Sequence, residues 1–169
     1  TCAKTLPDGD IFCWGDNTYG QIRPGTAPLD GDTTLIKPTL LNVPHDALTH
    51  LSLGKTHSCS ISAKPDVTTF KYVTRCWGSS LSGALGQDPT PGDTTEAGII
   101  PVSGFYNGAD PLPNFALDDT ALISVNDEST CTFSTEGSTP GSRTCWGAQT
   151  KGQLGDNNNA LVSPSNATP

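Results

Sequence analysis

The chain has 169 residues, of which 34% are hydrophobic and 15% are charged, and its formal net charge is −8. This composition excludes a helical bundle, a coiled coil and a large apolar core, and it leaves a loop-rich all-β protein or a largely disordered chain. The sequence contains 17 Asp and Glu against 9 Lys and Arg, with no basic cluster, which argues against nucleic acid as a partner. No apolar run approaches the ~18 residues that a membrane span requires, so we expect no membrane insertion.

The first predicted element is a hairpin that joins Cys2 to a strand over residues 10–14. The residues between them include Asp8 and Gly9, and an Asp-Gly pair favours a tight turn because glycine tolerates a positive φ. The strand ends in Cys-Trp-Gly at residues 13–15. This triplet recurs at residues 76–78 and 145–147, so the sequence contains three related units.

The second and third units contain a further predicted strand before their first cysteine. Residues 51–53 (Leu-Ser-Leu) and 123–125 (Ile-Ser-Val) alternate apolar and polar side chains at the same offset from Cys59 and Cys131. That period of two predicts a strand with one buried face. Residues 58–62 predict the next strand, and no stretch shows a convincing helical period. The sequence therefore predicts an all-β fold of short strands.

The six cysteines fall in pairs, with one pair in each unit. Two neighbouring antiparallel strands place opposite Cα atoms about 4.5–5.5 Å apart, which is within disulfide range. Of the roughly 15 pairings that six cysteines allow, the repeat selects Cys2–Cys13, Cys59–Cys76 and Cys131–Cys145. These bridges would offset the thin apolar content and make the disordered alternative untenable. They also favour an oxidising compartment, so we expect a secreted or cell-surface protein.

Further motifs accompany these cysteines. They are the segment at residues 54–59, Gly-Gln-Leu-Gly or near variants at residues 20–23, 83–86 and 152–155, and a following proline at Pro38, Pro101 and Pro164. Together the motifs resemble the regulator-of-chromosome-condensation repeat family, and the paired cysteines are similar to those of its secreted bacterial members. The resemblance implies a β-propeller with four-stranded antiparallel blades, seven in complete members.

By this resemblance the chain holds about three blades of an incomplete ring. Their repeats are expected at about residues 1–46, 47–118 and 119–169. The sequence departs from the family pattern at Arg23, at Ala84 and at residues 126–129, where Asn-Asp-Glu-Ser replaces the segment that holds Gly54 and His57. We expect these departures to affect the tightness of blade packing and not the fold.

The sequence favours structural roles for the tryptophan and histidine side chains. We expect the three tryptophans to pack between blades and not to bind a ligand, because a ligand site rarely recurs in every repeat; they are Trp14, Trp77 and Trp146. His57 is expected to make a hydrogen bond within its blade, while His45 and His50 are expected in a loop or at a strand edge. The acidic segments 30–32, 118–119 and 156–159 match no calcium motif. We expect no metal and no cofactor.

Surface candidates concentrate in the second repeat, which carries the long insertions. Aromatic side chains in Gly-, Pro- and Asn-rich loops are typical of partner contacts, and the candidates are Phe70, Tyr72, Phe105, Tyr106 and Phe115. Asn166 begins an Asn-Ala-Thr triplet and is a candidate site for an attached glycan.

No catalytic motif was found, so we expect the chain not to be an enzyme. The main hypothesis is an extracellular or cell-surface propeller segment for protein interaction or scaffolding. A first alternative is a self-assembling ring or fibre subunit, whose open blade edges pair with copies of itself. A second alternative is an enzyme inhibitor, by resemblance to the secreted β-lactamase inhibitor built on the same propeller.

Overall fold

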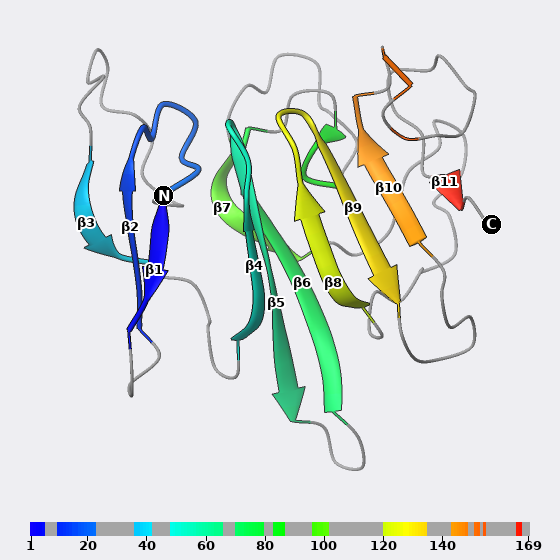
Figure 1. The fold of residues 1–169 in the computed structure, drawn as a ribbon, viewed down its shortest axis with the longest axis horizontal. Coiled ribbons are helices and arrows are strands. Elements are labelled where there is room, and N and C mark those ends of the chain that lie inside the picture. The colour runs from blue at the N-terminus through cyan, green and yellow to red at the C-terminus, as the bar shows by residue number, and fades with distance from the viewer. Residues whose placement is uncertain are drawn as a thin grey trace.

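A computed structural model describes residues 1–5, 10–22, 36–41, 48–65, 70–79, 83–86, 96–101, 120–134, 143–148, 151–152, 154 and 165–166. These residues form three antiparallel β-sheets that lie side by side in chain order (Figure 1). The prediction of an all-β fold is confirmed. Within the described residues, no helix has the length and apolar character to span a membrane.

The strands of each sheet follow one another in sequence. The first sheet has the order β1 (Cys2–Lys4), β2 (Ile11–Gly15), β3 (Ile36–Leu40). The second sheet consists of β4 (Leu48–Leu53), β5 (His57–Pro65), β6 (Phe70–Gly78) and β7 (Glu96–Pro101). The third sheet consists of β8 (Thr120–Val125), β9 (Ser129–Ser134), β10 (Arg143–Gly147) and β11 (Ser165–Asn166).

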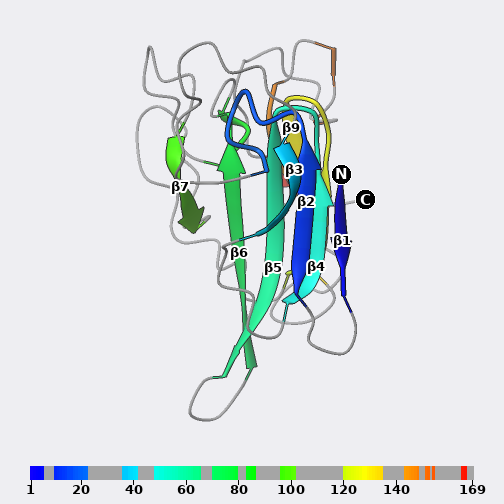
Figure 2. The same ribbon diagram turned by 90° about the vertical axis from the view of Figure 1, so that its left-hand side faces the viewer.

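The described part of the first sheet has three strands, where the sequence predicts four. Strand β1 carries Cys2 and therefore aligns with β5 and β9, which carry Cys59 and Cys131. Strands β4 and β8 have no counterpart among the described residues of the first sheet, where β1 is the edge strand. In Figure 2, β1 and β4 lie on one side of the molecule and β7 lies on the opposite side.

Each sheet places its two cysteines directly opposite each other on neighbouring strands. The register pairs Cys2 with Cys13, Cys59 with Cys76 and Cys131 with Cys145. Each pair forms a disulfide, with a Cα–Cα distance of 4.1 Å. These are the pairs that the repeat selects in the sequence.

The tryptophan of each Cys-Trp-Gly triplet lies on the opposite face of its strand from the cysteine, because side chains alternate along a strand. In the first two sheets the pairing with the outer strand shifts at this point, between Cys13 and Gly15 and between Cys76 and Gly78. Such a bulge leaves the intervening residue unpaired and can reorient its side chain. The sequence thus separates a disulfide face from a tryptophan face.

The apolar core lies between the sheets. One cluster joins Ile11, Cys13, Ile22 and Leu41 of the first sheet and its loops to Trp77 of the second. The other cluster joins side chains of the second sheet and of its β6–β7 loop to two side chains of the third sheet; its members are Cys59, Ile61, Cys76, Leu85, Ile123 and Trp146. Each sheet therefore packs its disulfide face against the tryptophan face of the next sheet.

Candidate binding site between the sheets

The same hydrogen bond crosses both junctions between sheets. The indole Nε1 of Trp77 donates to the carbonyl oxygen of Gln21 over 2.9 Å, and Nε1 of Trp146 donates to the carbonyl oxygen of Ala84, also over 2.9 Å. Gln21 and Ala84 occupy the same position of the loop that follows each Cys-Trp-Gly triplet. Both indoles are almost fully buried, at 0% and 1% exposure, so this bond satisfies a polar group that has no access to water.

A hydroxyl group from the next sheet reaches each of these carbonyls as well. Ser58 Oγ donates to Gln21 over 2.8 Å, and Thr130 Oγ1 donates to Ala84 over 3.1 Å. Ser58 and Thr130 both directly precede the first cysteine of their unit. A carbonyl oxygen has two lone pairs, so it can accept from an indole and a hydroxyl at once. The sequence signal of this contact is the hydroxyl residue that directly precedes the first cysteine of each unit.

His57 extends the polar chain across the second junction. Its Nε2 lies 2.8 Å from Thr130 Oγ1, whose single hydrogen is already directed to Ala84. The network therefore assigns the imidazole proton to Nε2, which donates to Thr130. The expected hydrogen bond within the blade is wrong, because His57 lies on the same face of β5 as Cys59 and that face packs on the third sheet.

Burial determines the protonation of His57. Its side chain has 0% exposure, and its Nδ1 has no hydrogen-bond partner. Desolvation lowers the pKa of His57 to about 4, while the backbone carbonyl of Asp127 acts in the opposite direction. The imidazole is therefore neutral at pH 7 and serves as a structural donor.

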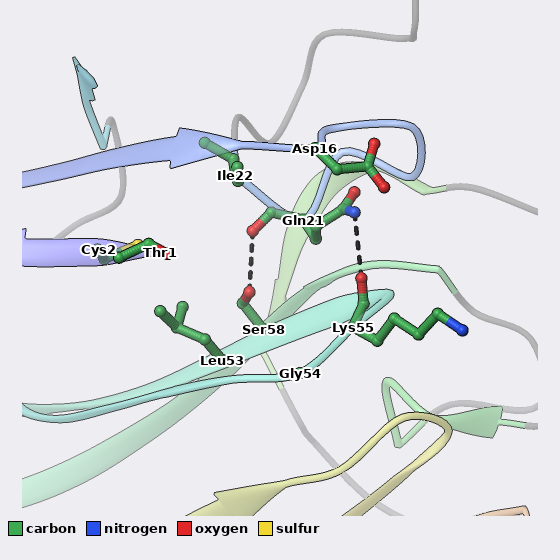
Figure 3. A pocket seen from close by; sticks show the side chains of 9 residues that line it. All are labelled: Thr1, Cys2, Asp16, Gln21, Ile22, Leu53, Gly54, Lys55 and Ser58. Atoms are coloured by element: carbon green, nitrogen blue, oxygen red, sulfur yellow. Dashed lines mark hydrogen bonds between the residues drawn. The ribbon is translucent and has the colours of Figure 1, made fainter. Parts of the chain in front are cut away.

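A cavity of about 150 Å³ lies between the first and second sheets (Figure 3). Thr1, Cys2 and Ile22 line it from the first sheet and its loop, and Leu53 and Lys55 line it from the second. Leu53 remains 38% exposed on this side. The apolar wall thus faces a space that the described chain does not fill.

The polar rim of the cavity is organised by Gln21, whose backbone carbonyl accepts from Ser58. The Gln21 side chain donates from Nε2 to the carbonyl oxygen of Lys55 over 3.2 Å, and Figure 3 shows both bonds. Asp16 lies at the same rim, where its carboxylate accepts from the backbone amide and the hydroxyl of Thr18. These two bonds lower the pKa of Asp16, so it is an anion at neutral pH.

The equivalent space between the second and third sheets is closed. There Ser52 Oγ accepts from the amide of Val125 over 2.9 Å, and Thr56 Oγ1 donates to the carbonyl of Asp127 over 2.7 Å. Gly54 fits so tightly that an added Cβ would lie 2.4 Å from the carbonyl oxygen of Asn126. Strand β4 and its hairpin therefore fill this position at the second junction.

The remaining candidates from the sequence lie mostly apart from this cavity. Phe70 and Tyr72 belong to β6, and Asn166 belongs to β11. His50 lies on β4, an edge strand of the second sheet. Trp14 is half-buried on β2, and its indole Nε1 has no hydrogen-bond partner within the described residues. Several candidates fall outside the described residues: Arg23, His45, Phe105, Tyr106, Phe115 and the segments 30–32, 118–119 and 156–159.

The chemistry available at the junctions is that of structural hydrogen bonding. All six cysteines form disulfides. Among the described residues, no three His, Cys, Asp or Glu side chains gather in a way that could hold a metal ion. The polar side chains that line the cavity carry a carboxylate (Asp16), an amide (Gln21), an ammonium group (Lys55) and two hydroxyl groups (Thr1 and Ser58).

Part of the chain matches a known repeat family. Residues 1–21 match the model of the regulator of chromosome condensation (RCC1) repeat. The predicted resemblance to this repeat family is confirmed. No curated protein sequence matches the chain.

Solved structures show the same fold. The chain aligns over 99% of its length with Prp20p from Saccharomyces cerevisiae, described with its binding to Gsp1p and histones, at 17% identity and a TM-score of 0.65. A yeast RCC1 (Prp20) chain bound to Kap60 aligns over 82% of this chain, at 21% identity and a TM-score of 0.53. Human WBSCR16 aligns over 92%, at 13% identity and a TM-score of 0.56.

The chain spans about a third of the length of these proteins, since the alignments cover 36%, 28% and 34% of them. The three sheets therefore correspond to blades of an RCC1-type propeller. At this level of identity the likeness establishes the fold.

Proposed function

We propose that the chain is a non-catalytic extracellular or cell-surface propeller segment that binds or scaffolds other proteins. The observation that carries this proposal is the structural use of its reactive side chains. The cysteines are closed in disulfides, and Trp77, Trp146 and His57 bond across the junctions between sheets. The function is therefore left to the residues on the surface, and these suit the binding of other proteins.

The three disulfides support the location. Disulfides form and persist in secreted and cell-surface proteins and are rare where thiols are kept reduced. The test is the mass of the protein isolated from its host's extracellular fraction, before and after reduction. We expect a gain of six hydrogens on reduction. Recovery of six free thiols from a cytosolic fraction would contradict the location, and excess mass would report glycans, for which Asn166 is the candidate site.

Protein partners are supported by the structural neighbours, of which Prp20p is described with Gsp1p and histones. We propose that the aromatic insertions of the second repeat make the contact, through Phe70, Tyr72, Phe105, Tyr106 and Phe115. The tagged chain is incubated with the host's extracellular proteins and treated with a cross-linker. A variant with Tyr72→Ala and Phe105→Ala should lose the cross-linked protein, whereas Lys37→Ala on the exposed β3 should keep it. Equal cross-linking by all three chains would overturn the assignment.

Self-assembly is a second candidate, favoured by the open face of the third sheet. Leu122 and Phe133 lie opposite each other on β8 and β9 and are 49% and 39% exposed. Ile61, which aligns with Phe133, has 0% exposure because the third sheet covers it. Light scattering should show assemblies that Phe133→Glu dissolves and that Leu40→Glu, at a residue with 47% exposure on β3, leaves intact. A monomer at all concentrations would exclude this candidate.

A further inference from the structure

We infer that the β5–β6 hairpin is a cationic docking arm, which binds an extended acidic segment of a partner protein through Lys64, Lys71 and Arg75. This inference deepens the proposed role in protein binding and rests on it. Strands β5 and β6 have nine residues each, whereas β4 in the same sheet has six. Figures 1 and 2 both show the tips of β5 and β6 extending past the ends of the neighbouring strands.

The far part of this hairpin is a two-stranded ribbon in the described chain. Strand β4 begins opposite Ser62, and β7 ends opposite Arg75. Beyond these positions β5 and β6 pair with each other as far as Pro65 and Phe70, and no other described strand joins them. The ribbon therefore projects from its sheet as an arm.

One face of the arm holds its positively charged residues. Successive residues alternate between the two faces of a strand, so the register assigns the positions of Lys64, Lys71 and Arg75 to the same face. Residues 58–78 contain these three cations and a single acidic residue, Asp66, in a chain whose formal net charge is −8. The arm thus has the opposite sign of charge from the chain as a whole, and this favours an anionic partner.

Arg75 has no counter-charge within the described residues. Its guanidinium donates to Ser62 Oγ over 2.7 Å, although the residue directly opposite is Ser60, so the side chain leans toward the tip of the arm. Ser62 is a neutral acceptor, and no Asp or Glu of the described chain forms an ion pair with Arg75. A guanidinium has five N–H donors in a planar fork that matches a carboxylate. Arg75 therefore suits a carboxylate supplied by a partner.

The third sheet shows that blade packing does not require this arginine. Thr132 and Thr144 occupy the positions of Ser60 and Arg75, at the same offsets from the cysteines. Both threonines are buried, and Thr132 Oγ1 donates to the carbonyl oxygen of Thr144 over 3.3 Å. In the second sheet, by contrast, Ser60 has 0% exposure and its Oγ has no hydrogen-bond partner among the described residues. An unsatisfied buried hydroxyl is destabilising, so the second sheet gives up a hydrogen bond where it carries a guanidinium.

Two like charges face each other nearer the tip, where the register places Lys64 opposite Lys71. Directly opposed like charges destabilise a hairpin, and a bound anion would relieve this repulsion. Lys71 and Arg75 are four positions apart on β6, a separation of about 13 Å along a strand. An extended segment presents every second side chain on one face. We therefore expect a partner segment with two acidic residues four positions apart.

The probe is a labelled peptide with the sequence Glu-Thr-Val-Thr-Glu between glycines, and its binding to the purified protein is measured by fluorescence anisotropy at low ionic strength. We expect saturable binding that Arg75→Gln and Lys71→Gln each weaken about fivefold or more. Lys37→Gln is the matched control, because it removes the same charge from an exposed position on β3. It should change the affinity less than about twofold. The peptide with glutamine at both glutamate positions should bind about tenfold more weakly or less tightly still.

The fold of each variant is checked by its disulfide content and its near-ultraviolet circular dichroism. Lys71→Gln lies in the two-stranded part of the arm, so it keeps the test decisive if Arg75→Gln does not fold. Absence of binding at millimolar peptide would overturn the inference. Equal weakening by Lys37→Gln would also overturn it, because the peptide would then respond to net charge alone. Tighter binding of an oligonucleotide with the same charge would overturn it in favour of a nucleic acid.

The outcome is distinguishable from that of the proposed function. If the peptide fails to bind while the cross-linked protein is retained, the cationic face is excluded and the role in protein binding stands. If the peptide binds as expected but no protein is cross-linked through Tyr72 and Phe105, the cationic face is supported and the aromatic contact is excluded.

Discussion

Trp146 in the third sheet donates its indole hydrogen to the carbonyl oxygen of Ala84, in the loop between β6 and β7 of the second sheet, 2.9 Å away. The two residues are separated by 62 positions in sequence. One sheet earlier, Trp77 and Gln21 make the same contact. This recurring bond ties each loop to the next sheet, and it determines where substitutions should weaken the molecule.

Replacing Trp146 by phenylalanine should therefore destabilise the protein. The change removes the indole donor and part of a side chain with 1% exposure, which together should lower the free energy of unfolding by about 2–3 kcal/mol. Urea denaturation measures the loss. Trp14→Phe is the matched control, because Trp14 is half-buried and its indole has no partner in the described chain. Equal losses for the two variants would refute the role of the bond.

The position of the tryptophans was predictable from sequence, whereas their partners were not. Three Cys-Trp-Gly triplets at matching offsets predict three equivalent strands and pair their cysteines. The acceptor of Trp146 is a backbone carbonyl, and every residue has one, so Ala84 carries no signal of its role in its side chain. Only the packing of the sheets selects it.

The sequence predicts four strands in each blade, and the first sheet departs from this because no described strand pairs with the free edge of β1. His57 was predicted to bond within its blade, although the period of two already places it on the face of Cys59. The aromatic candidates at Phe105, Tyr106 and Phe115 lie outside the described residues, so their role stays a prediction.

The disulfides of the native protein should be reduced in order of their solvent exposure, with the most exposed bond first. Cys59 and Cys76 each have 0% exposure, whereas Cys2 is partly exposed at the edge of the first sheet. Because thiol–disulfide exchange requires access to a sulfur, dithiothreitol should open Cys2–Cys13 well before Cys59–Cys76. Timed alkylation followed by mass spectrometry gives the order. First opening of Cys59–Cys76 in the folded protein would show that the second junction is looser than its packing indicates.

Alanine at Gly54 should destabilise the second junction through a steric clash. The backbone of Gly54 is outside the left-handed region, so the cost comes from the added Cβ, which would lie 2.7 Å from Val125 Cγ1 and 2.4 Å from the Asn126 oxygen. We expect a loss of about 1–3 kcal/mol. Val125→Ala removes the side-chain obstacle and leaves the carbonyl oxygens of Asn126 and His57, so the double variant should lose less than the sum of the single ones.

Gly152→Ala is the control for this coupling. At Gly152, φ is +74° and an added Cβ would meet nothing within 4 Å, so its cost is conformational, about 1–2 kcal/mol. That cost should add to the effect of Val125→Ala without interaction. Strict additivity for Gly54 as well would contradict the close contact.

Acidification should lower the free energy of unfolding because His57 is buried in its neutral form. The folded pKa of about 4 lies below the ordinary value of 6.5, so below pH 6.5 the unfolded chain binds a proton that the folded chain rejects. The stability from this group is complete above pH 6.5 and is lost as the pH falls toward 4. Between pH 7 and pH 4.5 the loss should reach about 2–3 kcal/mol.

His57→Gln isolates this contribution. Glutamine retains an amide donor for Thr130 and stays neutral throughout, while every carboxylate of the chain is unchanged. The variant should be less stable than the parent at pH 7, where the parent imidazole is neutral and well packed. Its free energy of unfolding should then fall less steeply toward pH 4.5, so that the two denaturation midpoints converge. If the free energy of unfolding had the same pH dependence in the two proteins, His57 would titrate in the folded state as it does in water. That result would contradict the lowered pKa expected from its burial.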